Sequence, residues 1–165
     1  MSKDVVAAEP VNGKMIGAAD HRDFVSVTIA DQLFGIPVLQ VQDVLGTQRI
    51  TRIPLAPAEV AGSLNLRGRI VTAIDIRVRL RLPPRTEGKQ AMSVVVDHGG
   101  ELYSLLVDSV GEVLSLEPTE LAAPPGALPE RWADSVRAVC QLERELLLIL
   151  DAPTLLQPRP AEVEV

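Results

Sequence analysis

Side chains that could perform nucleophilic, acid–base or metal chemistry are scarce in this chain. Its 165 residues include one cysteine, Cys140, and two histidines, His21 and His98. Nucleophile–base pairs and zinc sites draw mainly on these two residue types, so either would have to be built almost without them. A single cysteine excludes an internal disulfide, and the apolar phrase RAVCQL around Cys140 predicts a buried, inert thiol.

Three acidic residues have a placement that recurs along the chain, namely Asp75, Asp108 and Asp151. Asp75 and Asp151 each end an apolar strand and can cap a following helical turn, and Asp108 fits a turn. These structural roles account for all three carboxylates. We therefore predict a protein that is not an enzyme and that needs no metal and no cofactor.

The recurrence extends to whole phrases. LFGIPVLQVQDVLG begins at Leu33, and its counterpart LYSLLVDSVGEVLS begins at Leu102, 69 residues later. LNLRGRIVTAIDIRVRL begins at Leu64 and is answered by CQLERELLLILDAPTLL from Cys140, 76 residues later. Two phrases repeated in the same order indicate a duplicated unit, with a small insertion at LAAPPGALPERW in the second copy.

Each copy is rich in short strands. DFVSVTIA predicts one strand, and SVVVDHGGELYSLLVD predicts two around a Gly-Gly turn. Pro37 interrupts the repeated phrase, so a new strand is expected from Val41 to Leu45. LNLRGRIVTAID predicts a hairpin in which Gly68 takes a positive φ. IRVRLRL alternates like a strand, but its counterpart APTLL favours a helical turn, which we expect at both places.

These features predict a mainly β protein of two small barrels side by side. Residues 22–90 hold 10 Lys/Arg and 6 Asp/Glu, whereas residues 91–157 hold 3 and 11, so the surfaces of the two copies differ in sign. No signal peptide or long apolar run is present, and a cytoplasmic location is expected. The expected segments are a flexible tail at 1–21, one domain at 22–157 with copies at 22–82 and 92–157 around a connector at 83–91, and a flexible tail at 158–165. Exchange of strands between the barrels is left open.

Nucleic-acid binding is an alternative that the basic first copy raises. Its central part holds seven arginines: Arg49, Arg52, Arg67, Arg69, Arg77, Arg79 and Arg81. Only four aromatic residues occur in the whole chain, too few for a base-stacking platform, and the acidic second copy would repel phosphate. We therefore expect no nucleic-acid partner.

The phrases VQDV, TRIP, GSLNLRGRIV, AIDI and VDSVGEVLSL occur in this order. With them, the chain from about Asp23 to Leu156 resembles the CheW family of bacterial chemotaxis adaptors. The resemblance implies two five-stranded, SH3-like barrels around a shared apolar interface, with a few short helices. It also implies a non-enzymatic protein without a cofactor, in agreement with the scarcity of reactive side chains.

Proteins of this family couple the cytoplasmic tips of methyl-accepting chemoreceptors to the regulatory domain of the histidine kinase CheA. The same resemblance implies the following receptor-binding residues: Asp43, Arg67, Val41, Val44, Ile70 and Met92. It implies Val25, Val38 and Val41 as kinase-binding residues. Asp43 stands where the family usually has Glu, which keeps the charge on a shorter side chain. We predict that Asp43 forms an ion pair with Arg67. A CheW-like scaffold of another signalling pathway is the alternative function.

Overall fold

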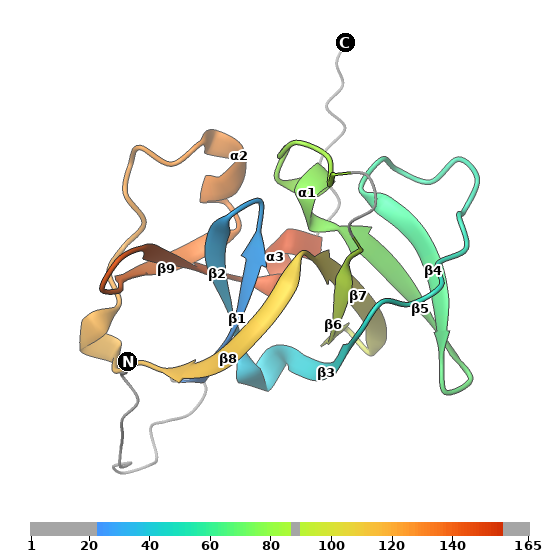
Figure 1. Ribbon diagram of the computed structural model, residues 1–165, viewed down its shortest axis with the longest axis horizontal. Coiled ribbons are helices and arrows are strands. Elements are labelled where there is room, and N and C mark those ends of the chain that lie inside the picture. The colour runs from blue at the N-terminus through green and yellow to red at the C-terminus, as the bar shows by residue number, and fades with distance from the viewer. Residues whose placement is uncertain (1–22, 87–89, 157–165) are drawn as a thin grey trace.

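The computed structural model describes residues 23–86 and 90–156, which form two five-stranded sheets, each curled into a small barrel (Figure 1). The tails predicted at 1–21 and 158–165 lie outside the described residues. Sheet A has the strand order β8 (Ser109–Ser115), β1 (Asp23–Ile29), β2 (Gln32–Pro37), β10 (Leu146–Leu150), β9 (Val136–Gln141). Sheet B has the order β3 (Val41–Leu45), β6 (Met92–His98), β7 (Glu101–Val107), β5 (Arg69–Asp75), β4 (Val60–Leu66). The short helices are η2 (Val38–Gln40), α1 (Ile76–Arg79), η3 (Pro118–Glu120), α2 (Glu130–Ala133) and α3 (Ala152–Leu156).

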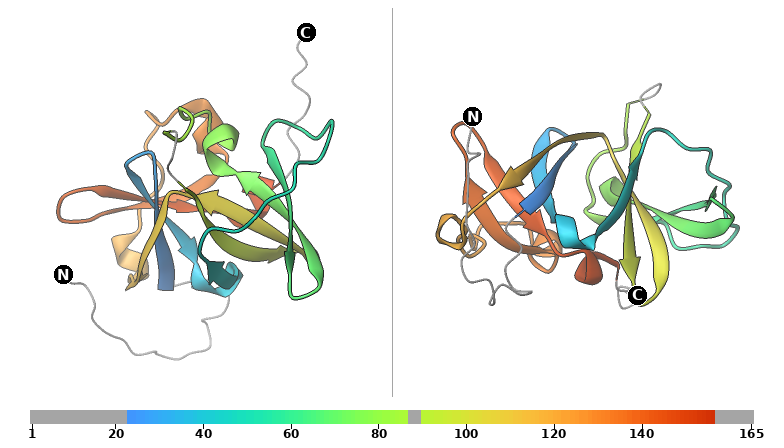
Figure 2. Two further views of the ribbon diagram at one scale, coloured as in Figure 1. Left: turned by 45° about the vertical axis from the view of Figure 1, so that its right-hand side comes forward. Right: turned by 90° about the horizontal axis from the view of Figure 1, so that it is seen from below.

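Strands of both sequence copies contribute to each barrel. Barrel A, built on sheet A, takes β1 and β2 from the first copy and β8, β9 and β10 from the second, and barrel B takes the remainder. Replacing every strand of sheet A by its counterpart in the other copy reproduces the strand order of sheet B. The duplication is therefore visible as a two-fold pattern of the sheets, and the barrels lie side by side (Figure 2).

The repeated phrase is the segment that passes from one barrel to the other. Its first occurrence holds β2 of sheet A, the η2 turn and β3 of sheet B. Its second occurrence holds β7 of sheet B and β8 of sheet A, with Asp108 between the two strands. The strand predicted from Val41 to Leu45 is confirmed, and so is the break after Pro37.

The ambiguous segment IRVRLRL begins as a helix, as its counterpart APTLL predicted. Asp75 ends β5 and its Oδ1 accepts a hydrogen bond of 3.0 Å from the backbone N–H of Arg77, which caps α1. The helical turn buries Ile76 and Leu80 completely and leaves Val78 41% exposed. A strand would have placed these three side chains on one face, whereas a helix brings only residues four apart together. Burial of Ile76 and Leu80 therefore accounts for the helix.

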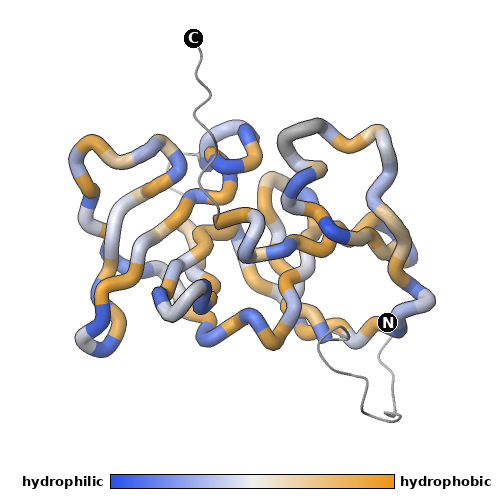
Figure 3. The backbone as a smooth tube through the Cα atoms, turned by 180° about the vertical axis from the view of Figure 1, so that it is seen from behind, coloured by the Kyte–Doolittle hydropathy of each residue, from blue (hydrophilic) through white to orange (hydrophobic). Residues whose placement is uncertain are grey.

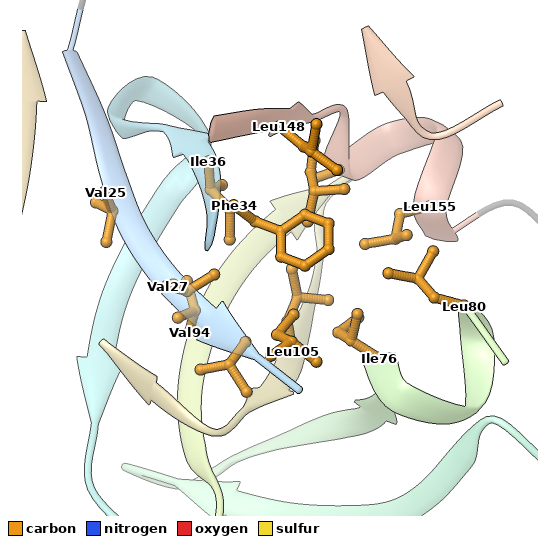
Figure 4. Close-up of a cluster of buried hydrophobic side chains, with 14 of the residues drawn as sticks. Val25, Val27, Phe34, Ile36, Ile76, Leu80, Val94, Leu105, Leu148 and Leu155 are labelled. Carbon is orange, nitrogen blue, oxygen red and sulfur yellow. The ribbon is translucent and has the colours of Figure 1, made fainter. Parts of the chain in front are cut away.

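Three clusters of apolar side chains stabilise the part of the chain that the structure describes. The central cluster lies between the barrels and combines residues of sheet A, such as Phe34, Ile36 and Leu148, with residues of sheet B, such as Val94 and Leu105 (Figure 4). A smaller cluster lies within barrel A: Phe24, Leu116, Cys140, Leu147 and Ile149. Another lies within barrel B: Leu64, Val71, Ala73 and Leu106. The thiol of Cys140 is buried, as predicted.

The segment inserted into the second copy covers one side of the central cluster. Its helix α2 carries Trp132, whose indole ring lies 5.7 Å from the ring of Phe34 on β2, measured between centroids. The indole N–H of Trp132 donates a hydrogen bond of 2.9 Å to the carbonyl oxygen of Leu80, just after α1. The insertion therefore links β2 of barrel A to α1, the helical turn that follows β5 of barrel B.

Candidate partner-binding surface

The β4–β5 hairpin holds Arg67 at its tip. Arg67 and Gly68 both have positive φ, 51° and 87°, which is the geometry of the tight turns that suit the twist of a hairpin. The side-chain oxygen of Asn65 accepts a hydrogen bond of 3.0 Å from the backbone N–H of Gly68 and fixes the turn. The predicted positive φ of Gly68 is confirmed. The local sequence Asn-Leu-Arg-Gly thus presents an arginine at a defined position.

Asp43 and Arg67 form the predicted ion pair. Nη2 of Arg67 lies 3.3 Å from Oδ2 of Asp43, and the two side chains are 75% and 29% exposed. Oδ1 of Asp43 accepts a further hydrogen bond of 2.9 Å from the backbone N–H of Val44. Because β3 and β4 are the two edges of sheet B, the pair joins one edge to the turn that follows the other. The carboxylate is held in place and the guanidinium keeps most of its surface open to a partner.

The apolar residues expected around this pair divide into two groups. Val44 is 38% exposed and Ile70 is 69% exposed, and both belong to strands that reach the pair. Val41 and Met92 are partly buried and pack against the central cluster. The structure therefore offers a surface with Asp43 and Arg67 as its polar part and Val44 and Ile70 as its exposed apolar part.

The residues expected to face a kinase are less accessible. Val25 on β1 is 7% exposed and belongs to the central cluster, and Val38 is partly buried against that cluster. Two residues that the sequence did not single out are open instead: Leu39 in η2 is 73% exposed, and Val113, which pairs with Val25 across β1 and β8, is 55% exposed. The segment VGEVLS does not alternate regularly between apolar and polar residues. The sequence therefore did not predict that the side chain of Val113 faces outward.

An ionic cluster at the crossing between the barrels was also absent from the sequence-based expectations. Asp108 accepts hydrogen bonds from Arg77 (Nε 3.1 Å, Nη2 2.7 Å), from Arg85 (Nε 3.2 Å) and from the backbone N–H of Ala30 (2.8 Å). Burial raises the pKa of the Asp108 carboxyl, but these hydrogen bonds outweigh burial and hold the pKa at about 2. Hydrogen bonding to Asp108 likewise raises the pKa of Arg77. The cluster ties the β1–β2 turn to α1 and the connector.

Comparison with known proteins identifies the family of this chain. The family model of the CheW-like domain matches residues 23–159. The chain belongs to the CheW-like family. This CheW-like chain is 28% identical to the chemotaxis protein CheW of Klebsiella aerogenes over 143 residues, which cover 87% of this chain and 86% of that protein. It is 26% identical to the chemotaxis protein CheW of Bacillus subtilis over 132 residues, covering 80% and 85%.

A solved structure resembles the CheW-like chain over nearly its whole described length. The crystal structure of the scaffolding protein TtCheW from Thermoanaerobacter tengcongensis superposes with a TM-score of 0.76 at 25% identity. The match covers 86% of this chain and 97% of that chain. The predicted mainly β fold with two SH3-like barrels is thereby confirmed.

The recurring acidic residues of this CheW-like chain are occupied by structural contacts. Asp75 caps α1, Asp108 joins the ionic cluster, and Asp151 accepts a hydrogen bond of 2.6 Å from the hydroxyl of Thr154 in α3. Within residues 23–86 and 90–156, no group of three or more His, Cys, Asp or Glu side chains could hold a metal ion. None of the helices in that same part of the chain has the length and apolar character needed to span a membrane.

Proposed function

We propose that the protein is a non-enzymatic adaptor that couples the cytoplasmic tips of chemoreceptors to the regulatory domain of a CheA-type histidine kinase. The observation that carries the proposal is the family match over residues 23–159. This range includes both barrels and the surface around Asp43 and Arg67. The names of the similar proteins, chemotaxis protein and scaffolding protein, support the same function. The adaptor would act in the cytoplasm, beside the membrane that holds the receptors.

The receptor would bind the surface formed by Asp43, Arg67, Val44 and Ile70. A guanidinium presents a planar set of donors, and Asp43 limits the orientations that this set can take. The exposed apolar side chains beside the pair would cover an apolar stripe of a receptor helix, a common mode of helix recognition. Val41 and Met92 would support this surface from beneath, since both pack against the central cluster.

The kinase would bind around η2 and the edge of barrel A. The regulatory domain of CheA is itself CheW-like, so the resemblance implies contact between two barrels. Val38 is the first residue of η2, Val41 follows this turn directly, and Val25 lies beside the edge strand β8. Partners that meet through a sheet edge and a few apolar side chains form modest interfaces, so a micromolar dissociation constant, roughly −8 kcal/mol, is expected.

Titration calorimetry of the full chain against the regulatory domain of the cognate kinase tests the proposal. Saturable binding is expected, together with kinase control in membranes that contain receptor, kinase and this protein. Arg67→Ala should keep the calorimetric binding and lose the receptor-dependent control. Arg144→Ala, an exposed arginine of the β9–β10 turn, is the matched control and should behave as wild type. Absence of binding heat at concentrations well above micromolar would contradict the proposal.

A further inference from the structure

The short helix α3 is held at both ends by side chains of the first sequence copy. Oε1 of Gln40 in η2 accepts a hydrogen bond of 3.2 Å from the backbone N–H of Ala152, the first residue of α3. At the other end, the buried Arg79 of α1 donates to the carbonyl oxygens of Leu155 (2.9 Å) and Thr154 (3.4 Å). Figure 1 shows α3 between the two barrels. A helix of five residues is thus tied to two segments that lie at least 75 residues earlier in the chain.

Gln40 supplies a cap that α3 cannot obtain from its own sequence. In α1, the carboxylate of Asp75 accepts from the backbone N–H two residues later. Asp151 is the equivalent aspartate before α3, but the residue two positions later is Pro153, which has no N–H. The backbone N–H of Ala152 needs an acceptor all the same, because this residue is 3% exposed and a buried donor is costly to leave unpaired. The side chain of Gln40 is that acceptor.

The same glutamine belongs to η2, the turn that exposes Leu39. Leu39 is 73% exposed and lies between Gln40 and Val38, which packs against the central cluster. The turn has three residues and closes with a hydrogen bond from the backbone N–H of Val41 to the carbonyl oxygen of Val38. A single turn of this kind has few hydrogen bonds of its own to fix its shape. The contact between Gln40 and α3 therefore adds a fixed point directly beside Leu39.

The other crossing between the barrels has an equivalent anchor. Asp108, between β7 and β8, binds Arg77 of α1 in an ion pair of 2.7 Å whose side chains are only 13% and 23% exposed. Each crossing is therefore tied to the short helix that ends the other sequence copy. Between Gln40 and α3 the tie is a neutral hydrogen bond, which is weaker than a hydrogen bond between charged groups. Loss of the Gln40 contact should consequently release η2 without unfolding the barrels.

We propose that Gln40 is a positioning residue that holds η2, and with it Leu39, in the conformation that the kinase regulatory domain binds. The inference rests on the proposed adaptor function, because it concerns the kinase contact around η2. Gln40 acts through its neighbour, since its own amide is engaged with α3. Figure 3 shows α3 near the middle of the molecule, with hydrophobic colour toward its end, where it packs on the central cluster. The helix is a fixed support, and a side chain that is already held in place loses less entropy when it binds.

Calorimetry of the full chain with the regulatory domain of the cognate kinase tests the proposal, at a temperature at which every variant is folded. Gln40→Met keeps the length of the side chain but removes the acceptor, and it should weaken kinase binding at least about tenfold. Gln40→Glu keeps an oxygen acceptor and should retain affinity close to that of wild type. Thr154→Val is the matched control, because it removes a different hydrogen bond of α3, the one to Asp151, and should leave kinase affinity unchanged. Wild-type affinity in Gln40→Met, or equal losses in Gln40→Met and Thr154→Val, would overturn the positioning role.

A double-mutant cycle with Leu39 separates positioning from direct contact. Leu39→Ala should weaken kinase binding by about tenfold, as expected for an apolar side chain in an interface. Adding Gln40→Met to Leu39→Ala should weaken binding little further, because the side chain that Gln40 positions has already been removed. Strictly additive losses would show that Gln40 acts independently of Leu39. Wild-type affinity in Leu39→Ala would show that this side chain is not part of the contact, and either result would reject the proposal.

Amide hydrogen exchange of the free protein tests the anchor without the kinase. In Gln40→Met the amides of Ala152 and Val41 should exchange faster, since the first loses its acceptor and the second closes η2. Thr154→Val should leave the exchange of Val41 unchanged. Unchanged exchange of Val41 in Gln40→Met would reject the positioning role whatever the kinase does. Absence of kinase binding by the wild-type chain would instead contradict the adaptor function, so the two failures can be told apart.

Discussion

At the scale of single residues, the Asp43–Arg67 pair contributes more to orientation than to folding. Arg67 is 75% exposed, and pairs this open typically contribute about 0 to 1 kcal/mol to stability. The turn that carries Arg67 is fixed by Asn65 and Gly68 and does not need the pair. The ion pair therefore restricts where the guanidinium points without deciding whether the hairpin forms.

Variants of the pair should separate receptor coupling from stability. Arg67→Ala and Asp43→Ala should each change the free energy of unfolding by less than about 1 kcal/mol and should keep kinase affinity. Both should lose receptor coupling. Arg67→Lys should keep only part of the wild-type coupling, since an ammonium cannot reproduce the planar set of donors of a guanidinium. Denaturant unfolding and receptor-binding titrations measure the two properties.

A double-mutant cycle on receptor affinity gives the decisive measurement for the Asp43–Arg67 pair. If Asp43 acts by positioning Arg67, the double variant should lose little more receptor affinity than Arg67→Ala alone. Strictly additive losses would mean that the two residues act separately. A large fall in stability in either single variant would assign that residue to the fold.

Asp108 is the residue whose charge state should matter for folding. Because hydrogen bonds from Arg77, Ala30 and Arg85 lower its pKa from 3.8 to about 2, the folded protein holds this carboxyl ionised more strongly than the unfolded chain does. The resulting stability is complete above pH 4 and is lost as the pH falls toward 2. Asp108→Asn should therefore lower the free energy of unfolding by about 1–3 kcal/mol at neutral pH.

The difference between wild type and Asp108→Asn should shrink between pH 4 and pH 2 in denaturant unfolding experiments. Asp134→Asn, at an exposed position, is the matched control and should change stability little at any pH. A difference that stays constant down to pH 2 would mean that the ionised carboxylate of Asp108 is not the stabilising group.

At the scale of elements, the β3–β4 loop depends on a glycine. Gly62 has a φ of 149°, and a Cβ at this position would lie 2.2 Å from the carbonyl oxygen of Thr51. Gly62→Ala must therefore displace the loop or break its hydrogen bonds to Ser63. We expect a loss of about 2–4 kcal/mol in the free energy of unfolding, typical of a backbone clash combined with strain.

Gly46→Ala is the control for this prediction, because a Cβ there would meet no atom within 4 Å. Its stability should stay close to that of wild type in the same unfolding experiment. Amide exchange at Thr51 and Ser63 should accelerate in Gly62→Ala, since these two groups exchange the anchoring hydrogen bonds. Unchanged protection at both amides would contradict the clash.

The sequence predicted the elements better than it predicted the contacts between them. Strands, the Arg-Gly hairpin and the helical turn after Asp75 follow from local rules, and pairing the two copies resolved the one ambiguous segment. The Asp43–Arg67 pair followed from the family resemblance. Arg85 and Asp108 are 23 residues apart, and Leu55 lies in an irregular loop, so neither the ionic cluster nor the exposed leucine leaves a periodic signal.

At the scale of the whole molecule, the exchange of strands joins the two barrels into one cooperative structure. Barrel A cannot be completed without β8, β9 and β10, and barrel B cannot be completed without β6 and β7. The largest apolar cluster lies between the barrels and takes residues from both. Neither sequence copy can therefore bury its apolar surface alone, and the barrels should unfold together.

Phe34→Ala tests this cooperativity. Phe34 is fully buried on β2, belongs to the central cluster and contacts Trp132, so its removal should cost about 3–5 kcal/mol. Because the cluster is shared, the slowest amides of both sheets should lose protection by the same free energy in native-state hydrogen exchange, although Phe34 belongs to sheet A alone. Leu55→Ala, in an exposed loop, should leave protection unchanged in both sheets. Loss of protection confined to sheet A would show that the barrels unfold separately and that the exchanged strands do not couple them.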